Sequence, residues 1–373
     1  MPEDAGTPPR SAARGAAPSG GAAPRARLVG IDAARGFALI GMFIAHAVPD
    51  GTGPWADLAF GIATERSRLL FAVTAGLGLG LLTGGVRPAV EQAARWVLRR
   101  QIAIRALILL VLGLLLTALG PLLYVILDEY GVAFFLMIPL VFLPARVLIP
   151  VGAVLLAAMP ALLVWIAAPG VVTARGLPPH SGGELADWFV TGSYPVVVWV
   201  PIMMIGVGLA RLGLDRARVV AWIGAAGVVA FVVGLVGTLA ISELGLQDQP
   251  STGVLWLDAV GASLFTVGNV GAALAVVAGL IALTALTAPG VRRVAAAVLS
   301  PVAAAGSMPL TVYTVQVVVL WATIRIEAGV PTDDSWATLG WLTFGSLLGA
   351  WLWRRFIGRG PLEWLVAVAS GRS

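Results

Sequence analysis

Cysteine is absent from the 373-residue chain, and histidine occurs only at His46 and His180. Without cysteine the protein can form no disulfide, no cysteine nucleophile and no thiolate metal site. Two histidines cannot build a multi-histidine zinc site, although a site of histidine and carboxylates stays open. The sequence therefore predicts chemistry that uses neither a thiol nor a metal.

Charged residues are also scarce. They make up 12% of the chain, against 59% hydrophobic residues, and the mean hydropathy is +0.94. A soluble protein of this size would carry about 25% charged residues. Because a helix satisfies its backbone hydrogen bonds within itself, we predict an all-α, polytopic helix bundle in a lipid bilayer.

Lysine is missing, so all 24 basic residues are arginine. The net charge of +5 could suit a nucleic acid, but the arginines cluster at the ends of apolar segments. They form no basic stripe interleaved with aromatic residues, so we expect no nucleic-acid partner. Arginine in such positions instead sets the orientation of a membrane protein.

Ten apolar segments come close to the length of about 20 residues that a bilayer requires. We predict spans at 27–48, 67–85, 101–119, 130–144, 147–167, 195–211, 218–241, 264–286, 302–324 and 336–356. With a cytoplasmic N-terminus, the outer loops hold only Arg66, Arg68, Arg175 and Arg325, and the other loop arginines lie inside. This asymmetry predicts a multi-pass plasma-membrane protein with both termini in the cytoplasm.

The two ends of the chain differ from the membrane domain, which we place at 27–358. Residues 1–26 are rich in Ala, Gly, Pro and Arg without periodicity, and predict a disordered basic cytoplasmic tail. Residues 359–373 are too short to span, and predict an interfacial segment anchored by Trp364.

A signal peptide is the alternative for the N-terminal end, since the triplet around His46 resembles a small-residue cleavage site. Asp32 and Arg35 lie in or just before the apolar region, which disfavours cleavage.

The first span, RLVGIDAARGFALIGMFIAHAV, carries Asp32, Arg35 and His46. Arg35 and His46 are eleven residues apart, which is about three helical turns, so they share one face roughly 16 Å apart. Charged groups in a membrane helix usually face a protein-lined interior. We therefore expect this helix to line a central polar cavity, with His46 at its outer end. Asp32 can pair with Arg35, and simple neutralisation of the helix is the alternative role.

His46 is the candidate for chemistry because an imidazole can act as a base or as a nucleophile near neutral pH. Polar residues elsewhere could serve the same site. Tyr313 and Gln316 share a face of the ninth span, and Glu65, Arg66 and Arg68 open the second span close to His46. Hydrogen bonds between helices and a helix-start charge pair are the alternative explanations.

Two further patterns concern packing and phosphate binding. Gly76, Gly80 and Gly84 repeat every four residues in an apolar span, which favours close helix packing over a phosphate loop. Arg99 and Arg100 fit the orientation pattern, whereas Arg105 lies deeper than orientation requires. It is a candidate for contact with a phosphate-rich cosubstrate.

RLVGIDAARGFALIGMFIAH resembles the opening helix of bacterial proteins related to heparan-α-glucosaminide N-acetyltransferase, in the transmembrane acyltransferase superfamily. The spacing of Arg35 and His46 also resembles the signature of related enzymes that O-acetylate surface polysaccharides. Other similar segments are RSRLLFAVTAGLGLGLLTGG, TGSYPVVVWVPIMMIGVGLARL, AAAGSMPLTVYTVQ and RGPLEWL. Bacterial relatives often have His where this chain has Gln316, and the heparan enzyme has its active histidine in a segment corresponding to 50–60.

The resemblance implies an enzyme of about ten or eleven helices that passes acetyl from cytoplasmic acetyl-CoA to an acceptor outside. It gives the catalytic role to His46 and places Arg35 at the acyl-CoA channel, with Asp32 positioning Arg35. We expect cosubstrate contacts from Arg99, Arg100, Arg105, Tyr313 and Gln316, and acceptor contacts from Glu65, Arg66 and Arg68.

We predict an acyltransferase acting on a sugar amine or hydroxyl of an envelope glycan or glycolipid, with acetyl-CoA or another acyl-CoA as cosubstrate and no metal. A homodimer is compatible with the sequence. The alternatives are a transporter or flippase of an amphiphilic solute, and a catalytically silent assembly partner.

Overall fold

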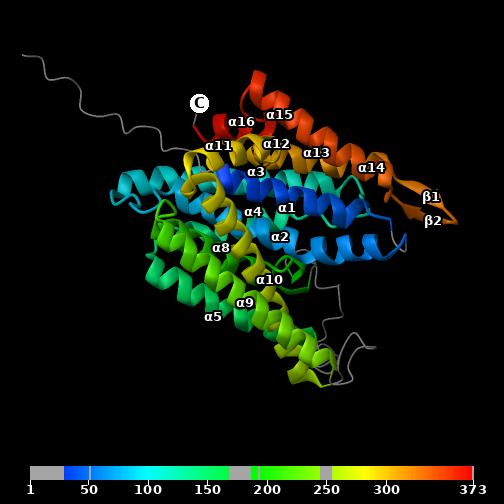
Figure 1. Cartoon of the computed structure of the whole chain (residues 1–373), viewed down its shortest axis with the longest axis horizontal. Helices are drawn as coiled ribbons and strands as arrows, with labels where there is room; N and C mark the ends of the chain where they lie inside the picture. Colours follow the sequence, from blue (N-terminus) through cyan, green and yellow to red (C-terminus); the bar gives the residue numbers. More distant parts are fainter. Residues whose placement is uncertain (1–28, 50–51, 168–185, 192–193, 244–253, 372–373) are drawn as a thin grey trace, which may run out of the picture.

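The computed structural model describes residues 29–49, 52–167, 186–191, 194–243 and 254–371, coloured in Figure 1. The predicted N-terminal tail and His180 lie outside the described residues. The described chain is helical apart from one hairpin. Its first helices are α1 (Val29–Ala47), α2 (Pro54–Leu82), α3 (Gln92–Thr117), α4 (Leu127–Leu140) and α5 (Ala145–Ala167).

The later helical elements include three short π-helical segments, η1, η2 and η3. In chain order, these later elements are η1 (Asp187–Thr191), α8 (Val196–Leu212), α9 (Ala217–Glu243), α10 (Leu255–Ile281), η2 (Ala282–Leu286), α11 (Pro289–Val298), α12 (Ser300–Ser307), α13 (Pro309–Ala322), α14 (Trp336–Gly340), η3 (Trp341–Gly345), α15 (Ser346–Phe356) and α16 (Pro361–Ala369). Strands β1 (Arg325–Glu327) and β2 (Val330–Thr332) pair antiparallel, with Ile326 opposite Pro331. This hairpin projects from the end of the bundle in Figure 1.

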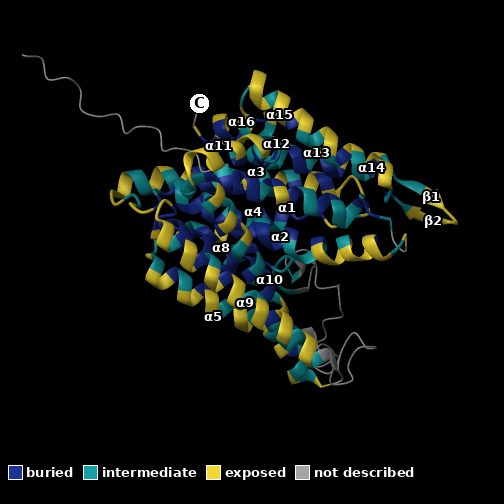
Figure 2. Cartoon of the chain, viewed as in Figure 1, coloured by how far each residue is buried: buried dark blue, intermediate teal, exposed yellow. Residues whose placement is uncertain are grey.

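Helix α1 lies in the middle of the bundle. It packs against α2 and α10 on one side and against α12, α13 and α14 on the other. Figure 2 shows buried residues concentrated in α1, α2 and α8, whereas exposed residues cover the outer faces of α5, α9 and α15. The outer helices expose apolar side chains such as Val229 and Phe344. In a bilayer these side chains meet hydrocarbon, so the predicted all-α, multi-pass membrane architecture holds.

Close contact between α1 and α12 depends on two glycines. A Cβ atom at Gly306 would lie 1.8 Å from the Asp32 carbonyl oxygen, and one at Gly36 would lie 2.1 Å from the Val302 carbonyl oxygen. Any side chain at either position would force the two backbones apart. These glycines let α12 press directly on the face of α1 that carries Asp32.

The glycine repeat of the second span has two different roles. Gly76 and Gly80 lie where a Cβ would meet α8 at Met203 and Ala210, so the packing prediction is confirmed for this pair. Gly84 lies beyond the end of α2, in a turn with φ of 118° that favours glycine. The prediction of a packing role is wrong for Gly84, because the helix has already ended.

Fewer helices meet the length and apolarity of a membrane span than the ten spans that the sequence predicts. Each of the ten predicted segments contains helix. In the part of the chain that the structure describes, five helices (α1, α3, α5, α9 and α10 with η2) are long and apolar enough to cross a membrane, or six with the α12–α13 pair. Helix α8 is shorter, with 17 residues. Ten spans stay a prediction.

The span predicted at 302–324 is not one straight helix, because α12 and α13 are bent by 87° at Met308. Pro309 is the first residue of α13. Proline has no N–H to donate and its ring clashes with the preceding turn, so it suits a helix start and not a helix interior. The bend sets the direction of α13, which carries Tyr313 and Gln316.

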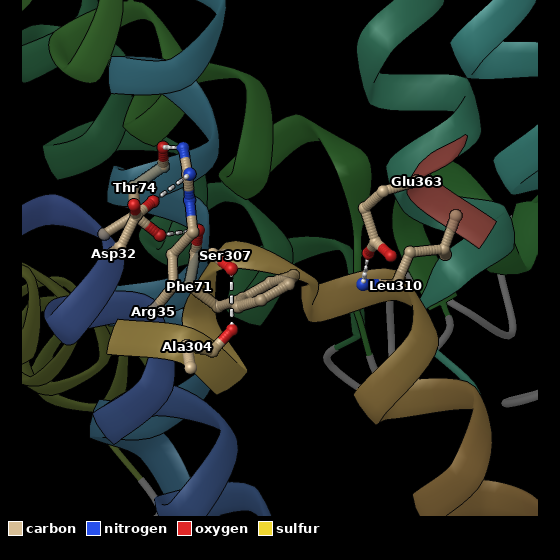
Figure 3. A network of polar contacts seen from close by, with 8 residues as sticks. All are labelled: Asp32, Arg35, Phe71, Thr74, Ala304, Ser307, Leu310 and Glu363. Atoms are coloured by element: carbon tan, nitrogen blue, oxygen red, sulfur yellow. Dashed lines mark hydrogen bonds and ion pairs between the residues drawn. The ribbon is translucent and has the colours of Figure 1, made fainter. Parts of the chain in front are cut away.

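Glu363 stabilises this bend from α16. Its carboxylate accepts hydrogen bonds from the backbone N–H groups of Leu310 and Thr311, at 2.7 and 3.2 Å, and from the Thr311 hydroxyl at 2.6 Å. In return the Thr311 hydroxyl accepts from the Leu362 backbone N–H at 3.1 Å. Each helix thus caps the other, and a carboxylate at a helix N-terminus also complements the helix dipole. Figure 3 shows Glu363 at Leu310.

Arg211, the last residue of the span predicted at 195–211, is buried at the end of α8. Its guanidinium donates to the backbone carbonyls of Gly85, Val141 and Leu143 and to the Thr83 hydroxyl. It therefore joins the ends of α2 and α4, in addition to any role in orientation.

Gly306→Ala should lower stability, because the new methyl group would overlap the Asp32 carbonyl. Overpacking of this kind costs about 1–3 kcal/mol. Thermal unfolding in detergent should show a lower midpoint for Gly306→Ala than for Gly279→Ala, since a Cβ at Gly279 in α10 meets nothing within 4 Å. Equal midpoints for the two variants would contradict the α1–α12 contact.

Glu363→Ala should also destabilise the protein, because two backbone N–H groups and one hydroxyl lose a charged acceptor. Hydrogen bonds to charged groups contribute about 1.5–3 kcal/mol each, although replacement by water at a partly buried end reduces this. The matched control is Glu327→Ala, which removes an exposed ion pair with Arg325. An exposed pair of this kind contributes about 0–1 kcal/mol. The comparison fails if both variants melt together.

Candidate functional site

His46 and Gln316 meet in the interior, at the C-terminal end of α1. The Gln316 side-chain nitrogen lies 2.8 Å from His46 Nδ1 and donates to the Met42 carbonyl oxygen at 3.3 Å. Gln316 is fully buried. The contact joins residues 270 positions apart in the sequence, and it exists because the bend before α13 brings that helix onto α1.

With the Gln316 amide in this orientation, the contact favours one tautomer of the neutral imidazole. The Gln316 atom that donates to the Met42 carbonyl must be the amide nitrogen, because the amide oxygen can only accept. The second hydrogen of this NH₂ group points to His46 Nδ1. Nδ1 is therefore the acceptor, and the ring proton lies on Nε2. Among the described residues Nε2 has no protein partner, so it is the nitrogen left for a substrate.

A pocket of about 90 Å³ surrounds His46. We call it the His46 pocket, and its lining residues are Met42, Ala45, His46, Thr64, Ser67, Arg68, Ile126, Tyr194 and Tyr313. A water molecule needs about 10–15 Å³ of such volume, so the pocket has room for several water-sized groups. An acetyl group, with three non-hydrogen atoms, fits within it.

Two buried polar atoms at this site have no partner among the described residues, one in the pocket wall and one on the residue that contacts His46. The Ser67 hydroxyl and Gln316 Oε1 are buried and have no hydrogen-bond partner in the described part of the chain. Buried polar groups are normally paired, so such atoms call for an explanation such as a bound ligand. Tyr313 differs, because its hydroxyl accepts from the Ile126 backbone N–H at 3.2 Å.

Glu65 and Arg68 form the predicted pair on α2. Arg68 Nε donates to Glu65 Oε2 at 3.0 Å, and the guanidinium lies 5.2 Å from the centre of the Tyr194 ring. Tyr194 precedes α8 outside the membrane-spanning helices, and burial raises the pKa of its hydroxyl despite the nearby Arg68. The hydroxyl therefore stays protonated and can donate. Arg66 points elsewhere, 5.7 Å from the Phe231 ring centre.

Asp32 and Arg35 form the other predicted pair, three turns below His46. Arg35 lies 3.5 Å from Asp32 and donates to the Thr74 carbonyl oxygen at 2.8 Å, as Figure 3 shows. The His46 pocket is not lined by Asp32 or Arg35. Leu39, which lies between Arg35 and His46 on α1, is fully buried. A single polar cavity that joins Arg35 to His46 stays a prediction.

Arg99, Arg100 and Arg105, which the sequence grouped with Tyr313 and Gln316, lie on α3, whereas Tyr313 and Gln316 lie on α13. Arg99 and Arg95 both lie over the Phe142 ring, at 5.4 and 5.2 Å from its centre. Arg100 is exposed and Arg105 is half-buried on α3. Tyr313 and Gln316 instead belong to the surroundings of His46, and no contact tests the cosubstrate role of either group.

Sequence reasoning missed Ser67, Thr64 and Tyr194 as parts of the site. Thr64 and Ser67 lie one helical turn apart beside the predicted Glu65–Arg68 pair, and this spacing was a usable signal. Tyr194 offered none, because its approach depends on how α8 packs against α2.

Comparison with protein families gives two matches. Residues 27–241 match the family described as heparan-alpha-glucosaminide N-acetyltransferase, catalytic. Residues 209–371 match a family described as a protein of unknown function, DUF418. No individually curated protein matches the chain.

The His46 pocket is built from both matched segments. His46, Ser67, Arg68 and Tyr194 fall in the first, and Tyr313 falls in the second. The first match covers more than half of the chain and includes α1 with its Asp32, Arg35 and His46. The chain therefore belongs to the heparan-α-glucosaminide N-acetyltransferase catalytic family of membrane acetyltransferases.

Proposed function

We propose that this protein transfers an acetyl or other short acyl group from cytoplasmic acyl-CoA to a sugar on the outer side of the plasma membrane. The acceptor is an amine or hydroxyl of an envelope glycan or glycolipid. The reaction forms an amide or ester, breaks the thioester, and moves one proton from the acceptor to the leaving thiol.

The single observation that carries this proposal is the His46 pocket. It combines room for an acetyl group with an imidazole nitrogen and a buried Ser67 hydroxyl that have no partner among the described residues. A membrane transporter would need a polar path, but it would need neither a small pocket nor an imidazole held by a specific amide. The family match also supports acyl-transfer chemistry.

His46 offers two kinds of assistance, depending on its tautomer. With the proton on Nε2, the ring can donate a hydrogen bond to a carbonyl oxygen and stabilise the charge that develops there. To take a proton from the acceptor, Nε2 must first be unprotonated, with the ring proton on Nδ1. Gln316 would then turn its amide so that Oε1, which has no partner among the described residues, accepts from Nδ1.

Acyl-CoA would supply the activated acyl group. The His46 pocket fits its acetyl end but has no room for the nucleotide, so the nucleotide would stay nearer the inner side. Arg95 and Arg99, which share the Phe142 ring, present two guanidinium groups suited to phosphate. Arg105 and Arg100 on the same helix add to this charge. Arg35 would contact the acyl-CoA between the nucleotide end and the His46 pocket. Asp32 would position the Arg35 guanidinium through their ion pair.

His46→Ala should reduce acetyl transfer by at least about 100-fold, because general acid–base assistance contributes about 10²–10⁴-fold. The assay is incubation of the purified full-length protein with radiolabelled acetyl-CoA and glucosamine, with release of free CoA measured in parallel. His180→Ala is the matched control and should retain activity. Transfer that survives His46→Ala would overturn the mechanism, and solute flux in vesicles without acetyl transfer would favour a transporter.

Gln316 should hold the imidazole as the Nε2-protonated tautomer, and this can be measured without any activity. The ¹⁵N NMR spectrum of histidine-labelled protein in a His180→Ala background, with a histidine-free purification tag, reports one ring. Gln316→Glu should move the proton to Nδ1, because a carboxylate only accepts hydrogen bonds. Gln316→Met, which neither donates nor accepts strongly, should give a mixture. A wild-type ring protonated on Nδ1 would contradict the geometry.

A further inference from the structure

A second pocket, of about 230 Å³, shares a wall with the His46 pocket. Arg68 lines both pockets. The second one, which we call the apolar pocket, lies between α2, α5, α8 and α10. It is more than twice as large as the His46 pocket, so it could hold a substantial part of a second substrate.

The walls of the apolar pocket suit hydrocarbon. They include Leu69, Leu163, Val198 and Trp199, together with two prolines. The Thr266 hydroxyl, which also lines it, already donates to the Ala262 carbonyl at 2.9 Å. A sugar ring would leave most of its hydroxyls without partners against such walls, and each buried unpaired hydroxyl is costly. A hydrocarbon chain needs no partners.

Among the described residues that line the apolar pocket, the charged ones are Glu65 and Arg68, which form an ion pair. Both side chains keep about a quarter of their surface exposed, with 27% for Glu65 and 26% for Arg68. A partly exposed guanidinium can bind a second anion in addition to its carboxylate partner, and its planar shape suits a phosphate. Arg68 stands at the boundary with His46, so an anion bound there would lie beside the proposed acyl-transfer site.

We infer that the acceptor is a lipid-anchored anionic molecule, whose hydrocarbon chain occupies the apolar pocket and whose phosphate or similar anion meets Arg68. This inference rests on the proposed function and narrows its acceptor to a lipid-linked one. The inference follows because the apolar pocket and the smaller His46 pocket lie side by side, with the Arg68 guanidinium in the wall of both. The sugar would then extend from the anion toward His46, and the free end of the chain would reach the bilayer.

The surrounding helices support entry from the membrane. Helix α5 exposes apolar side chains along its length, such as Val154 and Leu162. In a bilayer this face meets lipid chains, so a lipid-anchored acceptor would reach the pocket without leaving the membrane. An acceptor free in water would gain nothing from this wall.

The test uses photocrosslinking of full-length protein with dodecyl phosphate that carries a diazirine near the end of its chain. Leu163→Trp should fill the apolar pocket, and the loss of contact with about two methylene groups corresponds to about tenfold weaker labelling. Val198→Trp, on α8, fills the same pocket from another helix and guards against a folding defect in one variant. The matched control is Leu162→Trp, because Leu162 is the neighbouring residue on α5 and is exposed.

The expected result is labelling of peptides from α5 and α8 that falls with both pocket variants and persists with the control. Arg68→Gln should weaken labelling by dodecyl phosphate but not by the matching dodecanol probe. Equal labelling in all variants, or labelling independent of the phosphate, would overturn the inference and indicate ordinary lipid contact.

Measuring acetyl transfer to two acceptors distinguishes a failure of this inference from a failure of the proposed function. Transfer to dodecyl glucosaminyl phosphate should fall with Leu163→Trp, while transfer to free glucosamine should not. If free glucosamine is acetylated and the dodecyl probe never labels the pocket, the inference fails and the proposed function stands. If the probe labels the pocket and no acceptor is acetylated, the proposed function fails. A change in the preferred acyl-CoA chain length in Leu163→Trp would assign the pocket to the donor and overturn the inference.

Discussion

Polar groups inside this bundle must find partners within the protein, because neither hydrocarbon nor packed apolar side chains can hydrogen-bond to them. Helix α1 shows the consequence most clearly. Arg35 is balanced by Asp32 and by the Thr74 carbonyl, and His46 is held by Gln316. These contacts connect α1 to α2 and α13. The position of the central helix therefore follows from where its few polar side chains can be satisfied.

The same requirement shapes the break between α12 and α13. Ending one helix and starting another inside a bundle leaves backbone N–H groups without partners. Glu363, from the end of the chain, supplies the missing acceptors at Leu310 and Thr311. With the break stabilised, α13 can cross α1 at the angle that brings Gln316 to His46. A short C-terminal helix thus contributes indirectly to the geometry of the site.

The polar atoms that remain unsatisfied are informative for the same reason. The Ser67 hydroxyl, in the wall of the His46 pocket, and Gln316 Oε1, on the residue that contacts His46, have no hydrogen-bond partner among the described residues. A substrate bound at His46 would complete this pairing, which agrees with membership of an acetyltransferase family.

The sequence by itself determined the class of protein, the helical content and the two helical pairs, Asp32 with Arg35 and Glu65 with Arg68. These depend on composition and on spacing along one helix, which are local. It also indicated His46 and, through the resemblance, the family. Only the tertiary structure decided that Gln316 touches His46, that Glu363 caps α13, that Arg66 faces away and that Arg211 is buried. Those contacts join residues far apart in the chain, and they depend on helix directions that a bend at Pro309 and close packing at Gly36 and Gly306 set. No periodicity along the sequence encodes such directions, because they result from how whole helices fit against one another.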